Sequence, residues 1–322
     1  MTLVIPVLSF VLGLGLMLVL LHPTVRRWFL DHPNHRSLHA SPRPRSGGLA
    51  MVAGALVALA VLDVSSIVLF GALALALVSL ADDLGDVPAG LRLLVQVAVA
   101  SGFVVWGVSD VGWMLGASLV IASVWMINLF NFMDGADGLA GGMATIGFGT
   151  YAAAAWLQGD PALTTACLAV AASALAFLVF NFPPARIFMG DVGSIPMGFL
   201  VAAIGLLGWD RGVWGGWFPV VVFSPFVVDA SSTLIRRIIR REPVWQAHRS
   251  HYYQRQVLMG WTHRQLALAE YLLMLVSAFV ALLALDLDAN QAMVPIGALG
   301  LLYVGLMVGI DLRCSRREVA DA

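Results

Sequence analysis

The stretch NLFNFMDGADGLAGG, residues 128 to 142, interrupts an apolar chain with side chains that can do chemistry. Polar residues recur there at every third position: Asn128, Asn131, Asp134 and Asp137. If the stretch is helical, neighbouring members of this series share a face. Carboxamide and carboxylate oxygens are hard ligands suited to Mg²⁺ or Mn²⁺. Glycines let another group approach the backbone, and the helix start expected after Asp137 favours phosphate. The simpler interpretation, Asp137 as a helix cap, explains one aspartate only.

Two further acidic sites lie at the ends of apolar segments. Asp82 and Asp83 end one segment, and adjacent carboxylates at a membrane edge repel each other unless a positive group lies beside them. Asp191, with Gly190 and Gly193 close by, opens a later segment after the prolines of NFPPARIFMG. Each site could be a turn or a helix cap. Three such aspartate sites favour one shared site over three coincidences.

Basic residues gather in the stretch AHRSHYYQRQ, residues 247 to 256. Arginine binds phosphate oxygens through two hydrogen bonds, and histidine donates hydrogen bonds or moves protons near neutral pH. We therefore predict His248 as a catalytic residue and Arg249 and His251 as substrate-binding residues. A basic loop beside a membrane also serves as a topology signal or contacts lipid headgroups. The histidines allow a zinc site, but the oxygen ligands elsewhere favour magnesium.

A second basic stretch, DHPNHRSLHASPRPRSGG, covers residues 31 to 48. It carries His32, His35 and His39 together with several arginines, and it has no lysine of the kind found in a nucleotide P-loop. On its own it is as consistent with a loop as with a functional site. Arg45 in this stretch and Arg92, at the start of the fourth apolar segment, are predicted to bind substrate.

The elements that must hold these residues are membrane helices. Of 322 residues, 60% are hydrophobic and 11% charged, and the mean hydropathy is +0.89. A soluble protein is about half apolar and about a quarter charged. Because a spanning helix needs roughly 20 apolar residues, we predict an all-α, polytopic integral membrane protein with one domain, 1–322, and about 11 transmembrane helices. The predicted spans are 3–21, 47–63, 65–81, 91–109, 112–128, 138–157, 162–180, 194–209, 213–235, 265–285 and 291–311.

The basic residues predict the orientation. All 18 are arginines, and with eleven spans 17 of them fall on one side of the membrane, with Arg211 alone on the other. Basic residues near span ends stay cytoplasmic, so the N-terminus is expected in the periplasm and the C-terminus in the cytoplasm. The active site is then expected on the cytoplasmic face, in the loops 22–46, 82–90, 128–137, 181–193 and 236–264.

An acidic metal site beside basic phosphate-binding loops is typical of phosphoryl transfer, which depends on positioning and charge stabilisation. At the membrane surface, one substrate should be a lipid and the other a cytoplasmic molecule. The net charge of −1 gives no sign of a nucleic-acid partner, and none is expected. The alternatives are a secondary transporter, in which intramembrane acids and broken helices are common, and a scaffold without catalysis. The position of the acids at span ends, away from the midplane, disfavours a transporter.

Five motifs in order carry a family resemblance: RSLHASPRPRSGG, the Asp82–Asp83 pair, NLFNFMDGADGLAGG, FNFPPARIFMGDVGS and HRSHYYQR. Together they resemble the polyprenyl-phosphate N-acetylhexosamine-1-phosphate transferases, glycosyltransferase family 4. The resemblance implies a multi-pass protein of the bacterial inner membrane. It would transfer HexNAc-1-phosphate from a UDP-N-acetylhexosamine to undecaprenyl phosphate with Mg²⁺, releasing UMP. It also allows a homodimer.

The resemblance implies a role for each motif. Asn131 and Asp191 match the magnesium positions, and Asp82 and Asp83 match the pair that orients or deprotonates the lipid phosphate. Asp134 and Asp137 match the nucleotide-side loop.

The resemblance assigns the basic motif to the diphosphate and the sugar. This sequence has His-Arg-Ser-His where the pentapeptide-muramic acid branch of the family has a histidine triplet. That branch also has lysines after the acidic pair, and here Arg92 stands near the position of such a lysine. The pattern looks more like the enzymes that initiate O-antigen, lipopolysaccharide or related surface glycans.

Overall fold

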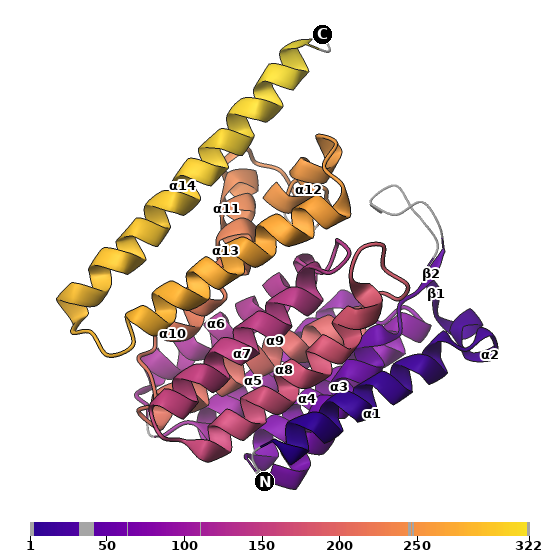
Figure 1. Ribbon diagram of the computed structural model, residues 1–322, viewed down its shortest axis with the longest axis vertical. Coiled ribbons are helices and arrows are strands. Elements are labelled where there is room, and N and C mark those ends of the chain that lie inside the picture. The colour runs from indigo at the N-terminus through magenta and orange to yellow at the C-terminus, as the bar shows by residue number, and fades with distance from the viewer. Residues whose placement is uncertain are drawn as a thin grey trace.

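The protein is a bundle of helices in a computed structural model that describes residues 3–31, 42–62, 64–109, 111–243, 246 and 248–320 (Figure 1). Long apolar runs with almost no charge form helices because each satisfies its backbone hydrogen bonds internally. The elements are α1 (Val4–Leu21), α2 (Pro23–Arg26), η1 (Arg27–Phe29), β1 (Leu30–Asp31), β2 (Arg43–Pro44), α3 (Gly47–Leu62), α4 (Ser66–Leu84), α5 (Ala89–Gly107), α6 (Trp113–Phe132), α7 (Leu139–Leu157), α8 (Pro161–Asn181), α9 (Asp191–Asp210), α10 (Phe218–Val222), α11 (Ser224–Ile239), α12 (Tyr252–Leu258), α13 (His263–Leu283) and α14 (Ala289–Ala320).

The predicted all-α fold is confirmed, and each of the eleven predicted spans contains a helix. Within the described ranges, eight helices are long and apolar enough to cross a membrane: α1, α4, α5, α6, α8, α9, α13 and α14. The protein is therefore a polytopic membrane protein. The crossing number of eleven and the orientation stay predictions.

Two predicted segments differ from the structure. The segment 213–235 is not one helix, because it breaks at Phe223 into α10 and α11. Pro225 lies at the start of α11 and has no N–H to continue the hydrogen-bond ladder of α10. The segment 291–311 continues as α14 to Ala320, and the short helix α12 was not predicted.

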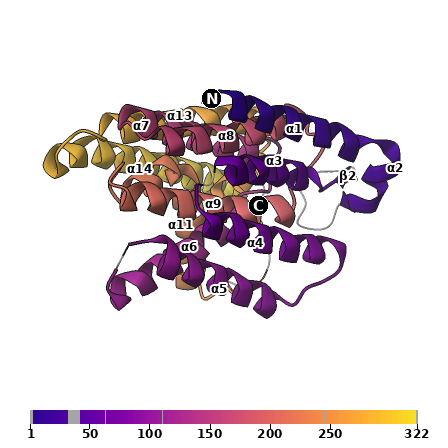
Figure 2. The ribbon, with the colours of Figure 1, turned by 90° about the horizontal axis from the view of Figure 1, so that it is seen from below.

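Helix α9 lies at the centre of the bundle and packs against α3, α4 and α6 (Figure 2). In α9, 83% of the apolar stretch that could span the membrane is buried inside the protein. In α14, only 11% of the corresponding stretch is buried. Small residues make this burial possible: a Cβ at Gly198 would lie 2.8 Å from the Ile127 Cα of α6. The centre of the protein is thus built from α9, and α14 lies at its edge.

The chemistry-bearing loops gather at one end of the bundle. Figure 1 shows the β1–β2 hairpin, the loop between α8 and α9, and α12 at the end away from the N-terminus. Backbone hydrogen bonds hold β2 and the start of α3 against the α8–α9 loop, from Phe188 N to Pro44 O (2.8 Å) and from Gly48 N to Met189 O (2.9 Å). Gly48 permits this contact, since a Cβ there would lie 2.3 Å from the Gly193 Cα. The result places Arg45 beside the start of α9.

Candidate active site

Asp83 anchors the acidic site to two elements. Its Oδ2 accepts a hydrogen bond from the backbone N of Val192 (3.1 Å), in the first turn of α9. Arg45 donates through Nη2 to the Asp83 carbonyl oxygen (2.6 Å), and its Nε lies 3.6 Å from Asp83 Oδ1. A carboxylate at a helix N-terminus is stabilised by the free N–H groups there. Asp83 therefore holds together the end of α4, the start of α9 and the residue that follows β2, Arg45.

Arg92 joins two more carboxylates of the acidic site, those of Asp82 and Asp191. One guanidinium nitrogen, Nη1, donates to Asp82 Oδ2 and lies 3.3 Å from Asp191 Oδ2. The second oxygen of Asp82 accepts from the backbone N of Val87 (2.9 Å), which fixes the α4–α5 loop. The side chains of Arg92 and Asp191 are 32% and 29% exposed, so solvent and a ligand can reach this end of the site.

Asn131 and Asp134 complete the acidic site from the α6–α7 side. Asn131 Oδ1 accepts from Ser194 Oγ (2.8 Å), and the Asn131 amide hydrogen-bonds Asp191. The Asp134 carboxylate accepts from the backbone N–H of Gly190. Burial first, and then the charges of Asp191 and Asp83, raise the pKa of Asp134 well above its usual value, although the Gly190 bond opposes them. The structure thus groups Asp134 with the metal positions predicted from sequence.

The charges of this site do not balance. When all four are ionised, the carboxylates of Asp82, Asp83, Asp134 and Asp191 outnumber the two arginines Arg45 and Arg92, and the raised pKa of Asp134 reflects its burial and then the cost of that excess negative charge. A divalent cation would supply the missing positive charge, and the donors are the oxygen ligands that Mg²⁺ prefers. In the part of the chain that the structure describes, no three His, Cys, Asp or Glu side chains converge on one point. Since Mg²⁺ usually takes one or two carboxylates, with phosphates and water completing its shell, the residues fit it.

Asp137 connects the α6–α7 loop to two other elements. His263 Nδ1 lies 3.2 Å from Asp137 Oδ1 and 3.1 Å from its backbone N, and Asp137 Oδ2 accepts from the backbone N of Ala185 (3.0 Å). Burial raises the pKa of Asp137, but the bonds from His263 and Ala185 and the charges of His263 and Arg43 outweigh it and lower the pKa. Asp137 does not cap α7, because Gly138 is the N-cap, with φ +78°.

The glycines of the stretch have a different role from the one expected. A Cβ at Gly142 would lie 2.0 Å from Tyr271 Cε1, and one at Gly135 would lie 2.1 Å from the Tyr253 hydroxyl. These glycines admit aromatic side chains of α13 and α12, so close approach of a ligand does not explain them. Asn128 donates to Gln96 Oε1 (2.7 Å) and to the Val124 carbonyl, which links α6 to α5.

The basic motif is organised by Asp229, a buried residue of α11 that sequence reasoning missed. Its Oδ1 lies 3.1 Å from His251 Nδ1 and accepts from Tyr252 N (3.0 Å), while its Oδ2 accepts from Tyr253 N (3.0 Å). Asp229 is 8% exposed and His251 4% exposed, so neither lies on the surface. A lone acid within an apolar run is itself a functional signal in membrane proteins and could have identified Asp229.

The remaining members of the basic motif lie closer to solvent. The His248 ring lies 4.9 Å from the His251 ring, centroid to centroid, and His248 Nδ1 is 2.8 Å from Ser250 Oγ. Arg249 is exposed. Tyr253 joins the motif to the acidic side, because its hydroxyl donates to the Phe132 carbonyl (3.1 Å). His32, His35 and His39 lie outside the described residues.

The amino-acid sequence matches one protein family and several named enzymes. The model of glycosyl transferase family 4 matches residues 65–208. The probable undecaprenyl-phosphate N-acetylglucosaminyl 1-phosphate transferase of Bacillus subtilis (strain 168) is 30% identical over 292 residues, 83% of this chain and 81% of that protein. The undecaprenyl-phosphate alpha-N-acetylglucosaminyl 1-phosphate transferase of Escherichia coli (strain K12) is 28% identical over 261 residues, which are 73% of this chain and 71% of that protein. The phospho-N-acetylmuramoyl-pentapeptide-transferase of Geobacillus kaustophilus (strain HTA426) is 39% identical over 161 residues, which are 49% of this chain and 47% of that protein.

Proposed function

The chain belongs to glycosyl transferase family 4, the polyprenyl-phosphate N-acetylhexosamine-1-phosphate transferases, and from this premise we propose its reaction. It transfers a HexNAc-1-phosphate from a UDP-sugar to undecaprenyl phosphate and releases UMP. The product is a polyprenyl-diphosphate-linked sugar. N-acetylglucosamine is the first donor to test, because the two relatives that span most of the chain carry it in their names.

The observation that carries this proposal is the unbalanced acidic site. All four of its carboxylates and Asn131 fall within residues 65–208, the part that matches the family. They lie at the ends of α4, α6 and α9, where a lipid phosphate held in the membrane can meet a nucleotide from the water. Phosphates carry negative charge, so their transfer here requires positive charge that Arg45 and Arg92 do not supply alone.

The magnesium site is the first part of the mechanism that we propose. Asp191 and Asn131 would hold Mg²⁺, with Mn²⁺ as a substitute, and the ion would neutralise the phosphates of the donor. Asn131 keeps one lone pair of its oxygen beside the bond from Ser194. Asp82 and Asp83 orient the lipid phosphate or take its proton. Of the two, Asp82 is the more accessible, because its side chain is 14% exposed and that of Asp83 is 5%.

The transfer step that we propose is a direct displacement. An oxygen of the lipid phosphate attacks the β-phosphorus of the donor and forms a new P–O bond. The bond from the β-phosphorus to the oxygen that bridges to the α-phosphorus breaks, and UMP leaves with that oxygen. The basic motif, with His248 and Arg249, contacts the diphosphate and the sugar. Asp137 lies towards the uridine side.

The cellular role is a finer proposal. We infer that the product initiates a cell-surface glycan, such as O-antigen or a related lipopolysaccharide, at the bacterial inner membrane. The His248–His251 motif supports this branch, since it lacks the histidine triplet expected of the pentapeptide-muramic acid branch. The shorter match to the pentapeptide transferase covers about half of each chain, which leaves the rest of this chain free to differ in substrate.

The reaction can be tested with the purified full-length chain in detergent. The mixture contains undecaprenyl phosphate, Mg²⁺ and one UDP-HexNAc at a time, and UMP release is measured. We expect UMP from one or more donors, UDP-N-acetylglucosamine first, and none when the lipid is left out. No UMP from any donor would overturn the proposal, as would transport of a UDP-sugar into vesicles without UMP release, which is what the alternative, a secondary transporter, would give.

A further inference from the structure

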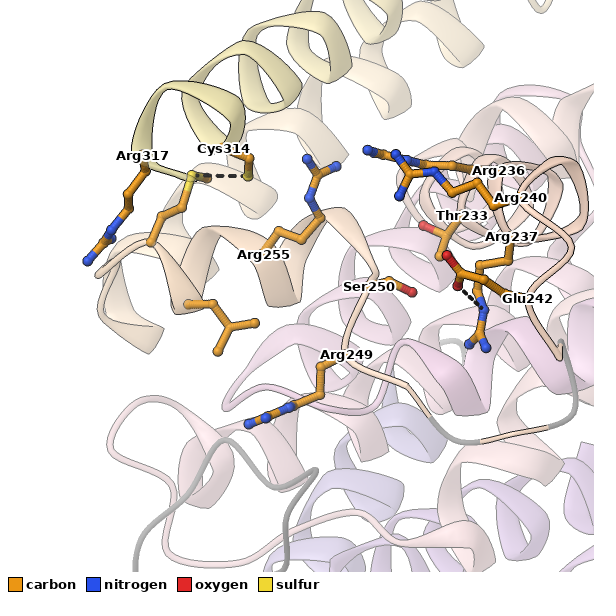
Figure 3. A pocket seen from close by; sticks show the side chains of 12 residues that line it. Thr233, Arg236, Arg237, Arg240, Glu242, Arg249, Ser250, Arg255, Cys314 and Arg317 are labelled. Atoms are coloured by element: carbon orange, nitrogen blue, oxygen red, sulfur yellow. Dashed lines mark hydrogen bonds and ion pairs between the residues drawn. The ribbon is translucent and has the colours of Figure 1, made fainter. Parts of the chain in front are cut away.

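A basic pocket of about 350 Å³ lies beside the proposed active site, between α11, α12 and α14. Figure 3 shows side chains from all three helices around it, with Arg236, Arg237 and Arg240 on one side and Arg255 and Arg317 across from them. We call it the arginine pocket. Six arginines line it: Arg236, Arg237, Arg240, Arg249, Arg255 and Arg317.

Carboxylates neutralise only part of this charge. Arg236 and Arg255 both bond to the same oxygen, Oδ1 of Asp311, at 2.7 and 2.6 Å. Glu242 Oε2 lies 3.2 Å from Arg237 Nε. Among the described residues, Arg240 and Arg249 form no ion pair, so the pocket keeps an excess of positive charge. Such an excess of positive charge in a concave surface attracts an anion.

Arg237 shows that the pocket is built into the fold. Its side chain is buried, 5% exposed as a whole residue, and its two terminal nitrogens donate to the carbonyls of Gln246 (3.3 Å) and Pro243 (2.8 Å). Its Nε is buried without a hydrogen bond, and Glu242 Oε2 lies 3.2 Å from it as an ion-pair partner. A buried guanidinium requires such a partner, so Arg237 is a fixed part of the pocket wall.

A topology signal alone does not explain this arrangement. Arginines that only keep a loop cytoplasmic need no concave surface and no burial. Here they come from three separate helices, and Thr233 and Ser250 add hydroxyl groups to the lining. Arg249, Ser250 and Arg255 belong also to the basic motif of the proposed active site, and the other lining residues do not.

The border of the pocket identifies the source of the anion. Two apolar residues of the lining, Leu258 and Met259, form an apolar rim, and Leu258 is 50% exposed. Helix α14, which contributes Cys314 and Arg317 to the lining, is the candidate span with the least burial inside the protein. A free phosphate has no use for this apolar rim, whereas a lipid bonds through its phosphate and lays its chains on the rim.

We propose that the arginine pocket binds the phosphate headgroup of an anionic membrane lipid, with its acyl chains along α11 and α14. The site is separate from the acidic site and does not depend on the proposed transfer reaction. Guanidinium groups recognise phosphate oxygens through paired hydrogen bonds.

The test measures lipid binding to the purified full-length chain in a neutral detergent. Native mass spectrometry quantifies bound phosphatidylglycerol, with phosphatidylcholine as the zwitterionic comparison and inorganic phosphate as the soluble competitor. We expect saturable phosphatidylglycerol binding that exceeds phosphatidylcholine binding. Arg237→Gln and Arg240→Gln should each weaken it about tenfold, which is the effect of losing one charge-assisted hydrogen bond.

Arg313→Gln is the matched control, because Arg313 is an exposed arginine of α14 that does not line the pocket. Its binding should equal that of the wild type. If Arg237→Gln does not fold, the exposed Arg240 decides the test alone. Equal binding of both lipids, or equal loss in Arg313→Gln, would overturn the proposal. Displacement of the lipid by inorganic phosphate at the same concentration as lipid would assign the pocket to a soluble anion instead.

Discussion

The acidic site and the arginine pocket are two charged regions joined through α12, and they hold their charges differently. In the acidic site, Arg45 and Arg92 are both bonded to aspartates, and carboxylates remain in excess. In the arginine pocket, carboxylates are the minority. The two proposals follow from this difference: we propose a divalent cation for the first region and a lipid phosphate for the second.

The largest expected effect comes from removing one carboxylate of the acidic site. Asp191→Asn removes the charge that faces Arg92 and Asn131, and we expect UMP release to fall by at least about 100-fold, the effect of deleting one group that stabilises transferred charge. Asp286→Asn, an exposed aspartate in a different loop, is the matched control and should keep full activity. Wild-type turnover in Asp191→Asn would remove Asp191 from the proposed metal site.

The next effect concerns Asp229 of α11, which accepts hydrogen bonds from the start of α12. Asp229→Asn places an amide N–H₂ where a carboxylate oxygen accepts from backbone N–H groups, which leaves buried donors facing each other. The cost should be about 1–3 kcal/mol of unfolding free energy, seen in a thermal unfolding curve. If Asp229 positions His251, kcat should fall at temperatures where the variant is still folded. Asp210→Asn is the control; unchanged kcat in a folded Asp229→Asn would make Asp229 purely structural.

A third prediction separates packing from ligand contact at Gly142, in the first turn of α7. Gly142→Ala drives a Cβ into the Tyr271 ring, so it should destabilise the fold by about 1–3 kcal/mol. Gly149→Ala on the same helix meets nothing within 4 Å and should be neutral or slightly stabilising. Loss of activity in Gly142→Ala without loss of stability would instead restore the expectation that this glycine admits a ligand.

The smallest effect is a pH dependence at Asp137. Its pKa is lowered in the folded protein, so its ionised form stabilises the fold above its unfolded pKa of about 3.9, and this stability is lost as the pH falls through the lower folded pKa. Asp137→Asn should cost about 1 kcal/mol near pH 7, and the difference from the wild type should shrink below about pH 4. A difference that stays constant across that range would rule out the ionised Asp137 carboxylate as the source of this stability.

The helices and the gathering of the acids were predictable from sequence for a clear physical reason. Apolar runs in lipid must be helices, and the one-sided arginines predict that Asp82, Asp134 and Asp191 share one face of the membrane. The structure brings these three residues together. The family indicated by the five motifs is confirmed by the matches to known proteins.

What could not be predicted depends on contacts between distant residues. The neighbours of Gly142 and Gly135 are Tyr271 and Tyr253, aromatic residues more than a hundred positions away, so the pattern around these glycines was that of loop residues. Asp229 sits alone in an apolar run, and its three partners at residues 251–253 become visible only when α12 folds against α11. Local pattern carries no signal for such pairs.

The central claim is that the acidic site performs the transfer with a divalent cation that makes up its missing positive charge. The most direct measurement is UMP release by the full-length chain from UDP-N-acetylglucosamine and undecaprenyl phosphate, first in EDTA and then during a titration with Mg²⁺. We predict no release in EDTA and full recovery with Mg²⁺ or Mn²⁺. Lipid-dependent UMP release that persists undiminished in EDTA would contradict the claim.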